Sequence, residues 1–291
     1  MNLKNYEKIK SRGVFGLLNF MTSEGLEWFE TRNHMLETGQ GSRSGCLGNL
    51  SSDCLVRSML AYFRDDDTAN MKQWAYLAAK ARIMCEHDTL NDYLTEDLLS
   101  PLIGDNEEVI DWYRQFKLPY ELSKSVIGGD KDDPKNWMFY RYQSWLALNA
   151  RWDELGERCE RILGMQEQIK KDRSYLIDHR FYLALAKGDK AGMTSVLLEK
   201  VSPRERKIRQ EQQSGVTWNL IDSYAVIFAK LAWRAGYELD LDTPWIPRDW
   251  LPVKPLPHYE EPWPFMRDFN IWQPFSEPYA HLSPKRPQRL T

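Results

Sequence analysis

The stretch that decides the fold runs from residue 217 to residue 259 and reads TWNLIDSYAVIFAKLAWRAGYELDLDTPWIPRDWLPVKPLPHY. Its first part carries an apolar stripe at helical spacing, broad enough to predict a largely buried helix. The stripe consists of Leu220, Tyr224, Ile227 and Leu231, flanked by Ile221, Ala225, Phe228 and Ala232. Gly236 is placed to end this helix in the left-handed conformation. The prolines that follow exclude a return to regular helix, so an extended segment is expected after it.

Before this stretch the helical patterns become repetitive, beginning near residue 131. The segment Trp145–Ala150 (WLALNA) matches Tyr182–Lys187 (YLALAK) at an offset of 37 residues. Each segment belongs to a pair of predicted helices joined by a tight turn, at Arg151–Asp153 in the first pair and at Gly188–Asp189 in the second. We expect Pro134 at the first position of the first helix. Such units bury their apolar faces only by stacking on each other, which predicts antiparallel αα-hairpins.

The N-terminal part is also predicted to be helical. Ser23–Leu36 and Ser51–Arg64 have helical periodicity, and the Gly- and Ser-rich residues 38–49 between them are predicted to form a loop. The turn that follows supplies an N-cap for a helix over residues 70–87. Asp105–Glu108 has the pattern of a capping box that opens a helix through Phe116. No run has the alternation of a β-strand, so the fold class is all-α.

Residues 244–291 differ in composition from the rest of the chain. Eleven of the fifteen prolines and four of the twelve tryptophans follow Gly236. Because disordered tails are usually poor in aromatic residues, we expect this segment to be extended and packed on the helices. The predicted organisation is a single all-helical domain over residues 1–243, wrapped by residues 244–291. Within that domain, N-terminal helices occupy residues 1–130 and hairpin repeats occupy residues 131–243.

The distribution of charge and the spacing of the cysteines limit the kinds of function that the protein can have. The net charge is −3, but residues 61–135 hold nine basic and sixteen acidic residues. This asymmetry argues against a nucleic-acid partner and favours a basic partner on the middle segment; a solvated acidic face is the alternative. The four cysteines, Cys46, Cys54, Cys85 and Cys159, lack the spacing of a disulfide framework or zinc site. With no signal peptide and no membrane-spanning run, we expect a cytoplasmic protein without membrane contact.

The familiar catalytic and phosphate-binding motifs are missing from the sequence. Ser44 and Cys46 lie in a glycine-rich segment, but no His or Asp has a spacing that marks a catalytic partner. His87 next to Asp88, with His34 upstream, leaves open an all-helical metal-dependent phosphohydrolase, although His87 also fits the end of a helix. The basic helix at residues 204–209 lacks interleaved aromatics and is interpreted as a solvated face. No enzyme activity and no cofactor are therefore expected.

Three patterns in the C-terminal half resemble the bacterial immunity protein 49 family of polymorphic toxin systems. They are Ala184-Leu-Ala-x-Gly-Asp189, Ala229-Lys-Leu-Ala-x-Arg-x-Gly236, and Asp242-x-Pro-x-Ile-Pro-Arg248 leading to Leu251. The resemblance implies a cytosolic inhibitor, without cofactors, that binds a cognate secreted toxin domain. The motif residues are interpreted as structural, serving turns, caps and chain reversal: Gly188, Asp189, Arg234, Gly236, Pro244 and Pro247.

Under this resemblance the partner is expected to be a basic toxin such as a nuclease, attracted by the acidic middle segment. The residues expected to contact it are Asp65, Asp66, Asp67, Glu107, Glu108, Asp130, Asp132 and Asp133. Two other hypotheses remain open on the sequence alone. One is a helical-repeat adaptor, and the other is the His/Asp metal phosphohydrolase.

Overall fold

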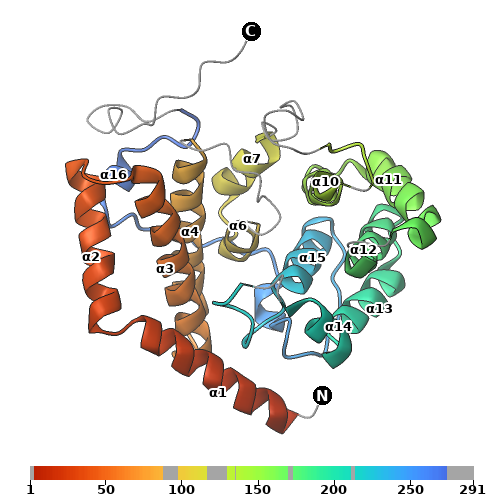
Figure 1. Cartoon of the computed structure of the whole chain (residues 1–291), viewed down its shortest axis with the longest axis horizontal. Helices are drawn as coiled ribbons and strands as arrows, with labels where there is room; N and C mark the ends of the chain where they lie inside the picture. Colours follow the sequence, from red (N-terminus) through yellow and green to blue (C-terminus); the bar gives the residue numbers. More distant parts are fainter. Residues whose placement is uncertain are drawn as a thin grey trace.

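The computed structural model of the chain describes residues 3–87, 98–116, 130–134, 136–169, 173–210 and 214–273. These residues form helices and connecting segments and contain no β-strand, which confirms the all-α fold class. Figure 1 shows four N-terminal helices on one side, the hairpins on the other, and α6, α7 and α15 between them. The core runs through both sides, because buried residues from the N-terminal helices and from the hairpins belong to one hydrophobic cluster.

The N-terminal helices are packed by their apolar faces, with α3 against both α2 and α4. Their bounds are α1 Leu3–Phe20, α2 Ser23–Thr38, α3 Arg43–Phe63 and α4 Thr68–Glu86. The loop predicted over residues 38–49 is wrong in its second half, because α3 begins at Arg43. The side chain of Ser42 caps this helix by accepting a hydrogen bond from the backbone N of Gly45, at 3.3 Å. Burial of Cys46, Leu47 and Leu50 offsets the low helix propensity of the glycines.

Two short helices connect the N-terminal side to the hairpins: α6, Leu99–Gly104, and α7, Glu107–Gln115. The capping box predicted at residues 105–108 is displaced by one residue. Asn106 is the N-cap of α7, and its side chain accepts a hydrogen bond from the backbone N of Val109, at 3.0 Å. Asp105 instead ends α6 in the left-handed conformation, with φ of 58°. This conformation directs the Asp105 side chain into the interior, where it is fully buried.

The predicted hairpins are present as α10 packed with α11, and α12 packed with α13. The bounds are α10 Trp137–Leu148, α11 Trp152–Gly164, α12 Leu176–Ala186, α13 Lys190–Lys200 and α14 Pro203–Ile208. Pro134 does not open α10, which starts three residues later behind the N-cap Asn136. The turn at Gly188 is as expected: its φ is 66°, and Asp189 caps α13. Ser202 caps α14 in the same way, with Pro203 at its first position.

The helix predicted to begin at Thr217 starts only at Ser223, so α15 spans Ser223–Arg234. Residues 217–222 form turns, and Asp222 is the N-cap. Leu220 and Ile221 are nevertheless fully buried. Their place in the apolar stripe therefore predicted burial correctly, although the backbone there is not helical. Almost the whole surface of α15 is buried, as its broad apolar stripe indicated. Gly236 follows with φ of 88°, which confirms the left-handed end of this region.

After Gly236 an extended segment, hereafter the C-terminal strap (residues 237–273), crosses the helices. It contains two short helical turns, η4 at Arg248–Trp250 and α16 at Pro264–Arg267. Trp245, Trp250 and Phe265 are buried, whereas Trp272 stays 41% exposed. The strap reaches α6 and the N-terminal helix α4: the hydroxyl of Tyr259 donates to the carbonyl oxygen of Gly104 at 2.6 Å, and the side chain of Gln73 donates to the backbone oxygen of Glu260 at 2.8 Å. The rest of the predicted wrap, residues 274–291 with Phe275, lies outside the described residues.

Candidate partner-binding surface

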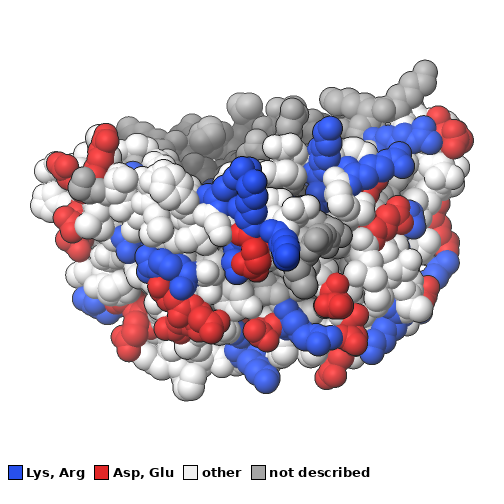
Figure 2. All heavy atoms as spheres, turned by 90° about the horizontal axis from the view of Figure 1, so that it is seen from below, with Lys and Arg blue, Asp and Glu red and all other residues white. Residues whose placement is uncertain are grey.

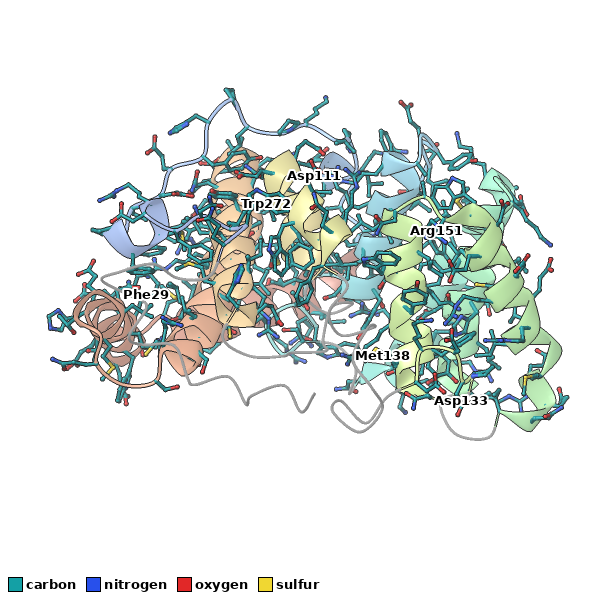
Figure 3. The ribbon with its side chains drawn as sticks, turned by 90° about the horizontal axis from the view of Figure 1, so that it is seen from above. Phe29, Asp111, Asp133, Met138, Arg151 and Trp272 are labelled. Carbon is teal, nitrogen blue, oxygen red and sulfur yellow. The ribbon has the colours of Figure 1, made fainter. Side chains whose placement is uncertain are left out.

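The acidic residues predicted to bind a partner lie at three separate places in the fold. Asp65, Asp66 and Asp67 form the turn between α3 and α4, near the lower edge of Figure 1, while Glu107 and Glu108 begin α7 in its upper part. The third group, residues 130–133, precedes α10. Figure 3 shows Asp133 far from Asp111 of α7. The structure therefore does not join the predicted contacts into one acidic patch.

The α3–α4 turn, hereafter the acidic turn (residues 65–67), is exposed. Asp65 forms an ion pair with Arg64, at 2.6 Å, which lowers the pKa of its carboxyl group. Asp67 is the N-cap of α4 and accepts a hydrogen bond from the backbone N of Asn70, at 2.9 Å. Asp66 lies between them in the left-handed conformation, with φ of 54°. The described residues provide no side-chain partner for the carboxylate of Asp66, so it is available to a ligand.

The fold places a further carboxylate beside this turn. Asp249 of η4 accepts a hydrogen bond from the hydroxyl of Tyr62, at 3.3 Å, and the Tyr62 ring packs on Trp250 with centroids 5.1 Å apart. Burial raises the pKa of Tyr62 to about 12, with further contributions from Asp249 and Asp66. Both carboxylates therefore act on the same hydroxyl. Sequence reasoning missed Asp249, because nothing local indicates that the strap returns to the end of α3.

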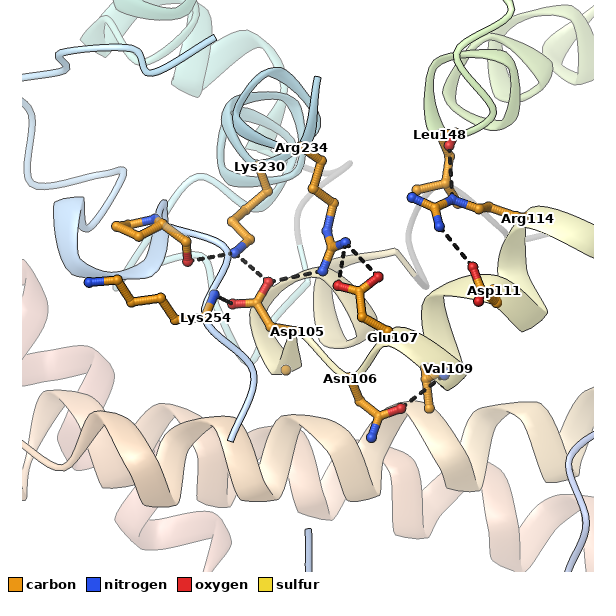
Figure 4. A network of polar contacts seen from close by, with 12 residues as sticks. Asp105, Asn106, Glu107, Val109, Asp111, Arg114, Leu148, Lys230, Arg234 and Lys254 are labelled. Carbon is orange, nitrogen blue, oxygen red and sulfur yellow. Dashed lines mark hydrogen bonds and ion pairs between the residues drawn. The ribbon is translucent and has the colours of Figure 1, made fainter. Parts of the chain in front are cut away.

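Glu107 is held in an ion-pair network, as Figure 4 shows. Its carboxylate accepts from Arg234 of α15 at 2.9 Å. Arg234 also donates to the buried Asp105, at 3.1 Å, and Asp105 accepts from Lys72 at 2.6 Å and from Lys230 at 2.7 Å. Burial lowers the pKa of Lys230 to about 8 against the opposing effect of Asp105. This network ties α4, α6 and α15 together, so the role of Glu107 in it is structural.

The third acidic group is balanced by neighbouring cations. Asp132 accepts from Arg158 of α11 at 3.0 Å and from Lys131 at 2.8 Å. Arg161 donates to the backbone oxygen of Asp132, at 2.9 Å. Partial burial raises the pKa of Asp132, but the hydrogen bonds and charges of Lys131 and Arg158 outweigh it, so the pKa is lowered. The negative charge of Asp132 is therefore largely balanced by cations of the same chain.

The basic helix predicted to be a solvated face is partly buried instead. Arg206 is buried against the ring of Trp245, with its guanidinium carbon 3.4 Å from the ring centroid, and donates to the backbone oxygen of Ile221 at 3.1 Å. Arg209 forms a buried ion pair with Asp178 of α12, which also accepts from Lys200 at 2.8 Å. The interpretation was wrong for these two arginines. The exposed Arg204 and Lys207 carry the same charge as the buried pair, so the sequence alone does not separate the two faces of this helix.

The residues considered for catalysis are not assembled into a site. All four cysteines are buried and are not joined in disulfides. The ring of His87 at the end of α4 contacts the backbone oxygen of Ile271 at 2.9 Å, and Asp88 lies outside the described residues. His179 is buried among aromatic rings, and burial lowers its pKa to about 4. Within the described ranges, no group of His, Cys, Asp and Glu side chains has a geometry that would hold a metal ion.

The three sequence patterns lie between the end of α12 and η4, within a continuous block of packed helices. Residues 153–250 match the family model described as Immunity protein 49. The resemblance inferred from the sequence patterns is thereby confirmed over these residues. No curated protein and no solved structure matches the chain. In the described part of the chain, no helix combines the length and apolar character needed to cross a membrane.

Within the matched region, three of the motif residues make structural contacts. Gly188 has a left-handed backbone, and a Cβ at this position would lie 2.8 Å from the hydroxyl of Tyr237. Asp189 caps α13, and Arg234 binds Asp105 and Glu107. The interpretation of these three residues as structural agrees with the contacts they make. These three motif residues therefore support the fold of the matched region.

Proposed function

We propose that this protein is an immunity protein that binds a cognate bacterial toxin in the cytoplasm and neutralises it by protein–protein contact. The observation that carries the proposal is the match of residues 153–250 to the Immunity protein 49 family. The architecture supports it, because stacked helical hairpins offer a broad, rigid surface for a protein partner. The proposal requires no catalytic group and no cofactor, and the protein acts by occupying a surface of the toxin.

We further propose that the toxin is basic, as nucleases are, and that it contacts acidic side chains of this chain. All eight residues predicted from the sequence remain candidates, but the contacts described above rank them. Asp66 and Glu108 are exposed, and no described residue pairs with their side chains, whereas Glu107 and Asp132 are bound by arginines. Asp249 joins the candidates through its position beside the acidic turn. An exposed carboxylate without a partner contributes most to steering a basic protein.

The proposal predicts that the gene immediately upstream encodes a secreted protein with a toxin domain, and it is tested with that domain. Co-expression of this protein should restore growth to cells that make the toxin domain, and the purified proteins should form a complex. If the toxin domain shows no binding and its toxicity is unchanged, the immunity function is wrong. Binding without loss of toxicity would favour an adaptor, the alternative that the sequence left open.

The acidic contact is tested by removing charge without changing shape. Asp66→Asn suits the left-handed conformation, which asparagine tolerates, and Asp249→Asn removes the second carboxylate. Together they should slow association with a basic toxin about tenfold at low salt and reduce its dependence on ionic strength. The matched control is Asp153→Asn with Glu157→Gln, which removes two exposed carboxylates from α11. Equal association rates for both double variants would refute the acidic contact but leave the immunity function intact.

A further inference from the structure

Two helices at the edge of the molecule, α1 and α2, expose an unusual amount of apolar surface. In Figure 1 they form an elbow, hereafter the α1–α2 elbow (residues 3–38), with α1 along the lower edge and α2 along the left edge. Eight large hydrophobic side chains of the described residues are strongly exposed, and five of them belong to this elbow. They are Phe15, Leu18, Phe20, Leu26 and Trp28, with Phe15 64% and Trp28 54% exposed. Exposed apolar groups gathered in this way mark interaction surfaces.

The elbow is held to the body by its inner side, so its outer side has a fixed position. On α1, the hydroxyl of Tyr6 donates to the backbone oxygen of Leu220 at 3.0 Å, and Gly13 allows close approach, since a Cβ there would lie 2.9 Å from Leu220. On α2, Phe29 packs edge-on against Trp263 with centroids 5.8 Å apart, and Arg32 pairs with Asp53. The exposed apolar side chains therefore do not result from a fraying terminus.

The two arms of the elbow carry opposite charge. Lys8 and Arg12 are exposed on α1, one helical turn apart, and Phe15 follows them on the same face. Exposed glutamates line α2: Glu24, Glu27, Glu30 and Glu37. The part of the chain that the structure describes gives none of these six side chains an ion-pair partner. Figure 2 looks onto the lower edge of Figure 1, where α1 lies, and shows acidic and basic side chains interspersed over that face as a whole. Along the chain the elbow thus runs from a basic arm on α1, through the exposed apolar residues on both sides of the bend (the apolar corner), to an acidic arm on α2.

We propose that the α1–α2 elbow is a homodimer interface, occupied by the elbow of a second copy of this chain. A two-fold axis through the apolar corner places the basic α1 of each copy opposite the acidic α2 of the other. The surface is then complementary to itself, as an isologous interface requires, and the apolar corners bury each other. Charge complementarity decides the occupant, because a second copy supplies both signs in the required order.

An anionic membrane is the other surface that an exposed basic and aromatic helix suggests. The acidic arm opposes it, since Glu24, Glu27, Glu30 and Glu37 would face the lipid head groups beside the basic arm. Binding of the monomeric chain to vesicles of anionic phospholipid, with no self-association, would overturn the dimer.

The dimer is tested by sedimentation of the full chain over the micromolar range, at low and high salt. We expect a monomer–dimer equilibrium that salt weakens. Two double variants reverse the charge of one arm each: Lys8→Glu with Arg12→Glu on α1, and Glu27→Lys with Glu30→Lys on α2. Each variant should raise the dissociation constant of the dimer at least about tenfold, because every substitution acts twice in a symmetric dimer. A chain that is monomeric throughout, or reversed variants that dimerise like the wild type, would overturn the proposal.

Mixing the two charge-reversed variants provides the decisive test of the pairing. Each interface half then pairs a reversed α1 with a reversed α2, or an unchanged α1 with an unchanged α2, so a heterodimer should form although neither variant dimerises alone. Its formation also shows that both variants are folded. Arg204→Glu with Lys207→Glu on α14, and Asp153→Lys with Glu157→Lys on α11, are the matched controls and should dimerise normally. Failure of the mixture to associate would contradict the proposed pairing.

Discussion

Replacement of Asp105 by asparagine is the sharpest perturbation that the fold offers. Asp105 is fully buried and accepts hydrogen bonds from three cations, Lys72, Lys230 and Arg234, as well as from the backbone N of Lys254. Asparagine keeps the size of the side chain and tolerates the left-handed backbone, so the substitution removes little beyond the charge. Of the three cations, Arg234 would keep its ion pair with Glu107, whereas Lys72 and Lys230 would lose the carboxylate that they share.

The expected cost is about 3–5 kcal/mol of unfolding free energy, the range for removing one partner from a buried ion pair. This is a large fraction of the roughly 5–15 kcal/mol that stabilises a typical domain. Urea unfolding followed by circular dichroism measures it. Asp111→Asn is the matched control, because Asp111 also pairs with an arginine, Arg114 at 2.7 Å, but is half exposed. The control should cost under about 1 kcal/mol.

A double variant separates loss of charge balance from general damage. Lys230→Met removes one of the cations stranded by Asp105→Asn and fills the same volume with an apolar chain. Added to Asp105→Asn, it should cost less than the sum of the two single substitutions. If Asp105→Asn costs no more than Asp111→Asn, or if the double variant is additive, the network does not stabilise the junction of α4, α6 and α15 as described.

Two further predictions concern the hairpins. Burial lowers the pKa of His179 to about 4, so on acidification the unfolded chain, with an ordinary value of about 6.5, binds the proton first. The unfolding free energy should therefore fall by up to about 3 kcal/mol between pH 6.5 and 4. The variant His179→Phe should lack this fall when denaturant titrations are made at each pH. Equal slopes of unfolding free energy against pH for the two proteins would refute the prediction. Gly188→Ala should lower thermal stability by about 1–2 kcal/mol, because φ is 66° and the new Cβ would meet Tyr237. An unchanged melting temperature would show that alanine at position 188 is not strained. The control is Gly215→Ala, at an exposed glycine whose added Cβ would meet no neighbouring atom.

The sequence predicted those features that depend on neighbours in the chain. Periodicity identified α15 as a core helix, and local chemistry identified an N-cap in the turn before α4 and the turn at Gly188–Asp189. Prediction failed where packing outweighs propensity: the N-terminal part of α3 is helical despite its glycines, because Leu47 and Leu50 are buried. The helix α1 was not predicted either, and its glycines explain why.

Features that join distant segments were beyond sequence reasoning. Lys230 meets Asp105 across 125 positions, and Tyr62 meets Asp249 across 187. The acidic residues illustrate the same limit. Composition indicated a negative middle segment, but only the fold shows that arginines from other helices bind Glu107 and Asp132 and that Asp249 lies beside the acidic turn.

The immunity function is tested most directly by titrating the purified chain with the toxin domain expected from the gene immediately upstream and by assaying toxin activity at each point. An immunity protein should form a saturable complex of sub-micromolar affinity, and toxin activity should fall in proportion to the complex formed. A toxin domain that remains fully active, with no complex at micromolar concentrations of both proteins, would contradict the account.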